Sequence, residues 1–468
     1  IKPTVSSVVR STSLSYFGRV NYVLMNRYMI TATMRRDGSS VLAYERRWDN
    51  FPSFSAAWDI KQEPFMKNAE AVEQFKIRYG YGVSGNQAVP AYSAFSKFTA
   101  SKGNDGLITY TLVPGNPALR WEKTYQSNVG LDAGFLKNRL TLTLDYYNKK
   151  TDGAINTVVL PDDTGQSSRL MNSAVITNKG LEVTIGATPV STNDFYWKTD
   201  LTLAHNEAKI EKLGGDITSK FMELGNAWGD SYFRFYEGQR IGTIFGLQST
   251  GTWSTAEIND PNIKKPMTPK VRPGSYKYID QPGENGEPDG IINADDYVII
   301  GDGQPVFNWG LNNQFTYKNL DLNLFLIGFH GFDIYNYPRA RLVNTLSPFP
   351  ELADRWIAEI NENAVIAGFG KDRDAISNES IASSTFVEKG DFIKLKNITL
   401  GYTMPRSLVS KIHLSSIRTY FSVQNLHTFT GYSGNDPKMA VSNPLRPGLD
   451  MGSYPSTRQF IFGLNVSF

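Results

Sequence analysis

The chain has 468 residues, a formal net charge of +3, 27 Phe, 24 Tyr, 40 Gly and no Cys. The small net charge, with no run of Lys or Arg, argues against a nucleic-acid partner, and the lack of Cys excludes disulfides and thiolate metal sites. No run of about 18 apolar residues is present, which excludes a transmembrane helix. A membrane-spanning β-barrel stays open, because alternating strands average to a low mean hydropathy, here −0.33. The first twenty residues contain no signal peptide, so we expect either a protein that is not exported or a chain whose residue 1 is not its beginning.

Segments of alternating polarity recur along the whole chain. In 140–147, Leu140, Leu142 and Leu144 share one face of a strand and Thr141 and Thr143 the other. The pattern predicts about thirteen strands: Tyr16–Leu24, Tyr28–Arg36, Phe54–Ile60, Phe75–Gly82, Tyr125–Phe135, Leu140–Tyr147, Leu181–Ala187, Trp197–His205, Trp309–Tyr317, Leu320–Phe329, Ile393–Met404, Ile417–Val423 and Phe460–Phe468. Most are near the nine to eleven residues, roughly, that suit a tilted membrane strand.

The connections between these segments have two lengths. Tight turns are expected at 25–27, 136–139 and 317–319, where Asn tolerates positive φ. Long excursions are expected at 84–120, 150–178, 206–306 and 331–390. Short turns on one side and long loops on the other are typical of outer-membrane barrels, whereas soluble sandwiches have more even spacing.

The polar faces of the expected strands also favour a membrane barrel. The apolar faces end in Tyr, Trp and Phe, as the aromatic girdles of a membrane barrel do. The opposite faces carry charged residues that a water-filled lumen would accommodate: Lys76, Arg78, Asp132, Asp145, Lys198, Asp200 and Arg418. The alternative is an extended soluble sheet protein with one solvated face.

Several ordered motifs resemble the C-terminal barrel of SusC/RagA-type TonB-dependent transporters of Bacteroidota. They include "YFGRVNYVLMNRYMITATMRRDGSS" (16–40), "FPSFSAAW" (51–58), "RYGYGVSGNQ" (78–87), "DFIKLKNITLGYTMP" (391–405) and "QNLHTFTGYSGNDP" (424–437). The resemblance runs from the first residues to Phe468, so the fold class we predict is all-β: an antiparallel transmembrane barrel with long extracellular loops and short periplasmic turns.

The resemblance implies a barrel of 22 strands whose lumen holds an N-terminal plug. It implies TonB-dependent import of oligosaccharides or oligopeptides across the outer membrane, driven through TonB, ExbB and ExbD, with a SusD-like lipoprotein lid and a dimer of SusC–SusD pairs. No segment resembles the plug, the TonB-contacting segment or the first barrel strands. We therefore expect residues 1–468 to be about thirteen of the 22 strands, the C-terminal portion of the barrel. The competing interpretations are a non-transporting surface module for glycan binding or adhesion, and a barrel enzyme.

The stretch "NGEPDGIINADD" (285–296) resembles a calcium loop. Asn285, Glu287 and Asp289 occupy positions 1, 3 and 5, Ile291 offers its carbonyl at position 7, and Asp296 stands at position 12. Many SusC-like chains carry an acidic loop here, which makes Asp280 an alternative first ligand. The loop is a candidate site for structural Ca²⁺, against an acidic turn that holds no metal, and the sequence implies no required cofactor.

Aromatic residues in the expected long loops are candidates for cargo contact, because they can stack on sugar rings or on peptide side chains. The residues singled out are Trp228, Tyr232, Phe235, Trp253 and Tyr335. Packing within the loops, or docking of the lid, is the alternative role. Dispersed His residues, the lack of a G-x-S-x-G elbow and the lack of a P-loop argue against an enzyme.

The terminal strand Phe460–Phe468 carries Phe460, Phe462, Leu464 and Val466 on one face, which we expect to contact lipid. A barrel strand needs a partner on each edge. We predict that one edge pairs with Ile417–Val423 and that the other faces a segment outside these 468 residues.

Overall fold

The computed structural model describes residues 8–87, 89–102, 107–159, 168–214, 219–221, 234–267, 270–283, 285–343, 354–368 and 383–468. The chain divides into two compact units. The first comprises 1–189, 198–219 and 236–239, and the second comprises 190–197, 220–235 and 240–468.

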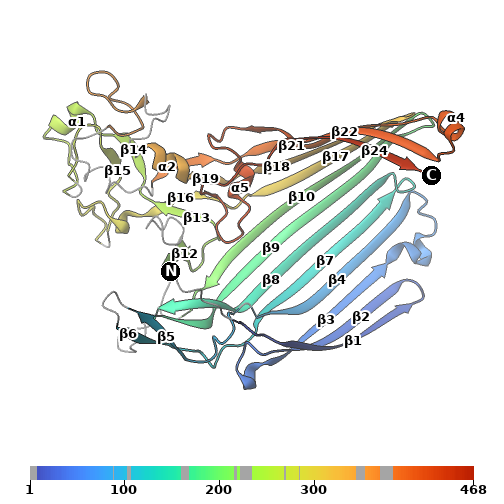
Figure 1. The fold of residues 1–468 in the computed structure, drawn as a ribbon, viewed down its shortest axis with the longest axis horizontal. Coiled ribbons are helices and arrows are strands. Elements are labelled where there is room, and N and C mark those ends of the chain that lie inside the picture. Colours follow the sequence, from blue (N-terminus) through green and yellow to red (C-terminus); the bar gives the residue numbers. More distant parts are fainter. Residues whose placement is uncertain are drawn as a thin grey trace. The chain divides into compact units, whose positions relative to one another are not determined.

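Thirteen antiparallel strands form one sheet in the order β1-β2-β3-β4-β7-β8-β9-β10-β17-β18-β21-β22-β24 (Figure 1). Their bounds are β1 Ser13–Leu24, β2 Tyr28–Ser39, β3 Trp48–Asp59, β4 Val72–Asn86, β7 Glu122–Phe135, β8 Leu140–Val159, β9 Ser168–Ser191, β10 Phe195–Lys212, β17 Phe307–Tyr317, β18 Leu320–His330, β21 Phe392–Thr403, β22 Ser416–Thr430 and β24 Gln459–Ser467. Each of the thirteen segments predicted from alternation overlaps one of these strands, to within one residue at the ends of 54–60, 393–404 and 460–468, so the expected all-β fold is confirmed.

Several strands extend well beyond the expected membrane-spanning length. Strand β8 has 20 residues and β9 has 24. The expected loop at 150–178 was therefore wrong for most of its length, because β8 continues to Val159 and β9 begins at Ser168. Alternation marks a strand only where one face is apolar, so a strand with water on both faces has no such signature.

The expected tight turns are present at one end of the strands. Met25, Asn26, Leu136, Asn138 and Lys318 all have positive φ. The backbone amide of Arg27 donates to the carbonyl of Leu24 at 3.0 Å, and that of Arg139 donates to Leu136 at 3.2 Å. These contacts close the β1–β2 hairpin over three residues and the β7–β8 hairpin over four.

Large apolar side chains stand exposed along the sheet. Phe462 is 82% exposed and Leu464 63%, and one face of β4 exposes Ile77, Tyr79 and Tyr81. Water would disfavour such a continuous apolar face, whereas a lipid bilayer stabilises it. None of the helices among the described residues is long and apolar enough to span a membrane.

Most of the buried apolar residues lie in the connections, and a minority, such as Phe51 and Phe392, lie on strands of the sheet. One cluster combines Val41, Leu42, Phe51, Leu119 and Trp121 in the first unit. Two others lie in the second unit, where three connections pack on one another. The connections contain β5 Lys97–Lys102, β6 Ile108–Val113, β11 Ser219–Phe221, β12 Arg234–Tyr236, β13 Thr243–Gly246, β14 Ser249–Thr252, α1 Thr255–Asn259, β15 Tyr276–Tyr278, β16 Val298–Asp302, β19 Asp333–Asn336, α2 Tyr337–Val343, β20 Val387–Lys389, α4 Arg406–Val409, α5 Pro437–Ala440 and β23 Leu449–Asp450.

The terminal strand β24 pairs with β22 as predicted. Ile417 lies opposite Val466, and Val423 lies opposite Phe460. Among the described residues β1 and β24 are the two ends of the sheet order. A partner for the second edge of β24 outside this chain stays a prediction.

Candidate functional site

Charged residues on the polar face of the sheet pair with residues of strands one or two positions away in the sheet order. Arg78 of β4 donates from Nε to Asp132 of β7 at 2.8 Å and from Nη2 to Asp145 of β8 at 3.0 Å. In the second unit Arg418 of β22 contacts both carboxylate oxygens of Asp321, at 3.0 and 2.5 Å. The polar face is therefore a network of matched charges, as suits a wall that faces water.

Glycines make room for these pairs. Gly130 lies opposite both Arg78 and Asp145, and a Cβ at Gly130 would come within 2.6 Å of each. Gly401 lies opposite Asp321, and a Cβ at Gly401 would come within 2.4 Å of both Asp321 and Arg418. At both places a side chain reaches the second strand away past a glycine of the intervening strand.

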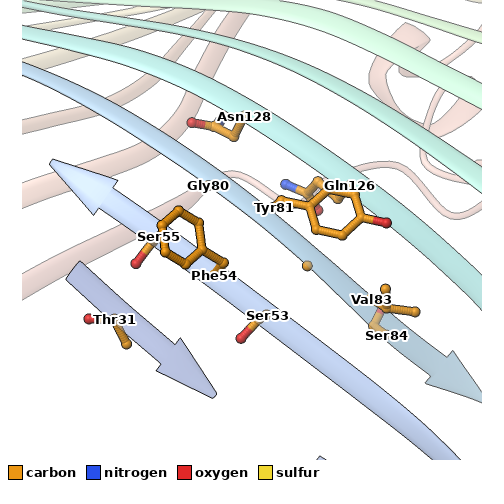
Figure 2. A pocket seen from close by; sticks show the side chains of 11 residues that line it. Thr31, Ser53, Phe54, Ser55, Gly80, Tyr81, Val83, Ser84, Gln126 and Asn128 are labelled. Atoms are coloured by element: carbon orange, nitrogen blue, oxygen red, sulfur yellow. The ribbon is translucent and has the colours of Figure 1, made fainter. Parts of the chain in front are cut away.

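A hollow of about 350 Å³ opens on β2, β3, β4 and β7 (Figure 2). Thr31 pairs with Ser55, Ser55 with Gly80, and Gly80 with Asn128, so the four residues form one row across the sheet. Nothing lies within 4 Å of where a Cβ would stand on Gly80. The polar side chains that line the hollow are Thr31, Ser53, Ser55, Ser84, Gln126 and Asn128. They are uncharged donors and acceptors, suited to hydroxyl and amide groups.

In the second unit the long connections form an ordered cluster with its own core, which we call the loop core. Its buried members are Ile244, Tyr276, Tyr335, Tyr337, Ala340, Val343, Ile366, Ala367, Phe386 and Leu449. Strand β19 joins the three-stranded sheet β20-β19-β23, in which its pairing with β20 is antiparallel and that with β23 parallel. Segments far apart in the sequence thus pack together.

The predicted cargo-contacting aromatics fall into three groups. Tyr335 is 0% exposed and Trp253 is 4% exposed, so neither has free surface for stacking on cargo in this arrangement. Both occupy packing roles, with Lys277 Nζ lying 4.8 Å from the centroid of the Trp253 ring. Phe235 is half-buried on β12. Trp228 and Tyr232 lie outside the described residues. A cargo contact for Phe235 therefore stays a prediction.

The acidic loop is held largely by backbone amides. Asp296, 4% exposed, accepts hydrogen bonds from the amides of Gln281 and Asn293, both at 2.8 Å. Asp289 Oδ1 accepts from the Ile291 amide at 2.7 Å, and Asp280 Oδ2 accepts from the Gly290 amide at 2.8 Å. These contacts bring the ends of the loop together.

Within the described part of the chain, no group of three or more His, Cys, Asp or Glu side chains could hold a metal ion. Asn285, Glu287 and the Ile291 carbonyl belong to the same loop, and Asp280 Oδ1 is a buried oxygen without a hydrogen-bond partner. Calcium binding at this loop stays a prediction, with Asp280 Oδ1 as its best-placed oxygen.

A second group of charged residues lies in the connections of the second unit. Arg240 contacts Asp302 at 2.5 Å, Asp302 is repelled by the nearby Asp333 carboxylate, and Asp333 in turn pairs with Lys389 at 2.7 Å. Burial raises the pKa of Asp302 above its ordinary value, although the Gln304 amide and Arg240 oppose that shift. Burial and a 2.6 Å hydrogen bond to Asp450 raise the pKa of the Tyr432 hydroxyl.

Lys394 of β21 and Asp436 form a buried ion pair. The Nζ–Oδ2 distance is 2.8 Å, and the two side chains are 3% and 5% exposed. Burial alone would raise the pKa of Asp436, but hydrogen bonds from Lys394 and Ser456 outweigh it and leave that pKa lowered. Alternation gave no sign of this pair, because Asp436 lies in a connection 42 residues away from Lys394.

Comparison with known proteins identifies the family. The family described as TonB dependent receptor-like, beta-barrel matches residues 2–426. TonB-dependent receptor P3 of Formosa agariphila is 34% identical, over 99% of this chain and 46% of that protein. TonB-dependent receptor SusC of Bacteroides thetaiotaomicron is 29% identical, over 100% of this chain and 45% of that protein.

The fold is similar to that of a solved structure of the RagAB peptide transporter. The TM-score is 0.80 at 22% identity, over 98% of this chain and 48% of that chain. The chain spans about half the length of the curated relatives it matches. The family consists of outer-membrane transporters rather than enzymes, and the thirteen-stranded sheet corresponds to part of its barrel. The chain therefore belongs to the TonB-dependent receptor β-barrel family, as a SusC/RagA-type barrel portion.

Proposed function

We propose that this chain is the C-terminal barrel portion of an importer that moves oligosaccharides or oligopeptides across the outer membrane. The observation that carries the proposal is the match over the whole chain to SusC, together with the fold similarity to the RagAB peptide transporter. The polar, charge-paired face of the sheet fits the wall of a water-filled conduit. The mechanism is binding and gated passage, without chemistry on the cargo.

The partners proposed are those of a SusC/RagA-type importer. A SusD-like lipoprotein would cover the loops, TonB with ExbB and ExbD would supply energy through the remainder of the protein, and two such pairs would form a dimer. RagAB, whose fold this chain resembles, is a peptide transporter, which supports oligopeptides as one cargo class. Oligosaccharides, the other class that the sequence resemblance implies, are proposed alongside oligopeptides.

Uptake by intact cells tests this function. Cells that express the full-length protein should accumulate a fluorescently labelled oligopeptide or oligosaccharide, and deletion of its gene or of TonB should abolish accumulation. Purification from outer membranes should also recover a SusD-like lipoprotein. Surface binding that persists without TonB, with no internal accumulation, would instead identify a non-transporting glycan-binding or adhesion module.

A further inference from the structure

The lipid face of β2 carries an arginine near one end. The strands β1, β2 and β3 are neighbours in the sheet (Figure 1), and Arg36 shares a face of β2 with Ile30 and Met34, which are 42% and 49% exposed. The tight turn at 25–27 closes the opposite end of β2, so Arg36 lies at the end of the long connections, which is extracellular in outer-membrane barrels. An arginine on this face is costly within the hydrocarbon and is tolerated at the level of the lipid headgroups.

Three side chains with hydrogen-bond donors form a row at this end of the lipid face. Tyr16 of β1 lies directly opposite Arg36, and Arg36 lies directly opposite Asn50 of β3. All three residues are exposed. Directly opposite residues have Cβ atoms about 4.5–5.5 Å apart, so a hydroxyl, a guanidinium and an amide are close enough to contact one small group.

Trp48 packs against this row. Its ring stacks on Tyr16 with the centroids 5.9 Å apart, and Arg36 Cζ lies 5.7 Å from the Trp48 ring centroid. Trp48 pairs with Gly38, where a Cβ would come within 2.7 Å of the indole, so the glycine leaves room for the ring. The guanidinium is therefore held beside aromatic side chains of the kind that mark the boundary between hydrocarbon and headgroups.

Arg36 forms no ion pair with any of the residues that the structure describes. The carboxylates nearest along the strands belong to Asp37 and Asp49, which alternation places on the opposite, polar face. Both are paired there, Asp37 with Arg35 at 2.7 Å and Asp49 with Lys123 at 2.7 Å. The positive charge of Arg36 is therefore not compensated on the lipid side.

The other end of the same face has a similar arrangement that includes an anion. Tyr28 and Trp58 stack with their centroids 6.3 Å apart. Glu63 accepts from the Tyr28 hydroxyl at 2.6 Å and from the Trp58 indole at 3.0 Å, and it also accepts from Arg27 at 3.0 Å. Trp48 and Trp58 are ten residues apart on β3, which is about 26 Å along the membrane normal for a tilt of about 40°, close to the apolar band of about 25 Å. The stacked aromatic pair and the cation thus recur at both boundaries, and the protein supplies an anion at only one of them.

We propose that Tyr16, Arg36 and Asn50 bind the phosphate group of a phosphorylated lipid in the outer leaflet of the membrane. A phosphate accepts two charge-assisted hydrogen bonds from a guanidinium group, and the hydroxyl and the amide supply further donors. The acyl chains would lie on the exposed apolar side chains below, such as Val20. The lipid would supply the anion that Glu63 supplies at the other boundary. The inference depends on the outer-membrane location and not on import or cargo.

Native mass spectrometry of the full-length protein in detergent tests the site. The probe is monophosphoryl lipid A, and the reference is the same lipid after removal of its phosphate. We expect the parent protein to bind the phosphorylated lipid about tenfold or more tightly than the reference, because charge-assisted hydrogen bonds form only with the phosphate. Arg36→Met should abolish this preference, Asn50→Leu should reduce it, and Arg36→Lys should retain part of it.

The matched control is Arg19→Met. Arg19 of β1 lies on the opposite face, where it donates to Thr33 Oγ1 at 3.2 Å, so its removal should leave the preference unchanged. All variants should keep the heat-modifiable electrophoretic band that marks the folded barrel. The proposal is overturned if the parent binds both lipids equally or if Arg36→Met keeps the preference. Displacement of the lipid by inorganic phosphate at the same concentration would assign the site to a free anion and refute a lipid site.

Discussion

Arg78 Nη2 lies 3.0 Å from Asp145 Oδ2, although strand β7 separates the strands that carry the two residues. The contact passes over Gly130, which pairs with Arg78 on one side and with Asp145 on the other. The same guanidinium also holds Asp132 of the intervening strand at 2.8 Å. One arginine therefore cross-links three strands of the polar face.

Gly130→Ala should destabilise the barrel by about 1–3 kcal/mol, because the added methyl group forces the Arg78 and Asp145 side chains apart. The change is measured by heating samples to increasing temperatures and following, on electrophoresis, the loss of the heat-modifiable band that marks the folded barrel. Gly80→Ala is the matched control, since its Cβ would meet no atom within 4 Å. Equal melting of the two variants would show that the three-strand contact contributes nothing to stability.

Breaking the buried Lys394–Asp436 pair should be costly. Lys394→Met leaves Asp436 buried without its cation, and we expect about 3–5 kcal/mol of local destabilisation, seen as faster proteolysis of the connection at 431–458. Lys389→Met is the control, because Lys389 is 81% exposed in its pair with Asp333, and exposed pairs contribute about 0–1 kcal/mol. Similar cleavage rates in the two variants would contradict a structural role for the buried pair.

The same pair predicts a dependence on pH. The pKa of Asp436 is lower in the folded protein than in the unfolded chain, so its contribution is present above the ordinary pKa of aspartate and is lost as the pH falls through the folded value. Proteolysis with an acid-active protease should therefore accelerate at the acid end of the range. In Asp436→Asn this acceleration should be absent, and its persistence there would assign the transition to another group.

The register of the terminal strand can be tested by cross-linking, since the chain has no Cys of its own. Thr419 lies directly opposite Leu464. The double variant with Cys at 419 and 464 should form a disulfide under mild oxidation, because the Cβ atoms of directly opposite residues on paired strands are close enough for a disulfide to join them. Cys at 419 and 466 is the control with a two-residue offset. Equal cross-linking of both pairs would reveal a different or shifting register.

Phe386 is 0% exposed and belongs to the loop core. Phe386→Ala should destabilise this cluster by about 3–5 kcal/mol through lost burial and a cavity. The expected readout is faster proteolysis of the long connections, with the heat-modifiable band of the sheet unchanged. Tyr454→Ala, at an 81% exposed position, is the control and should cleave at the parent rate. Simultaneous loss of the band would mean that the loop core and sheet unfold together.

Asp296→Ala should open the acidic loop, because the buried carboxylate accepts two backbone amides and its removal leaves both unsatisfied, at about 1–3 kcal/mol each. Limited proteolysis within 280–296 measures this, with Asp295→Ala at an exposed neighbour as the control. Exchange into a chelating buffer tests the calcium prediction separately. Faster cleavage on chelation supports Asp280 as a ligand, and an unchanged rate identifies a loop that holds no metal.

Sequence by itself determined the barrel strands. A membrane strand must place apolar residues toward lipid at every second position, so β18 and β24 are readable from periodicity alone, and even the pairing of Phe460–Phe468 with Ile417–Val423 follows from their order. Turn chemistry located the hairpin at Asn26 for a similarly local reason.

Only the tertiary structure decided what the connections and the polar face do. Tyr335 and Trp253 are aromatic residues of the kind that can bind cargo, yet both are buried. Tyr335 is buried because the loop core brings together segments that are distant in the sequence, and no local sequence pattern predicts that packing. The continuation of β8 and β9 into 150–178 could not be predicted from alternation, because a strand with water on both faces has no apolar face. The pairing of Arg78 with Asp145 depends on the strand register and on the glycine between them, and the pairing of Lys394 with Asp436 depends on how a connection folds onto β21. Neither pairing produces a periodic pattern in the sequence, because the partners are far apart along the chain.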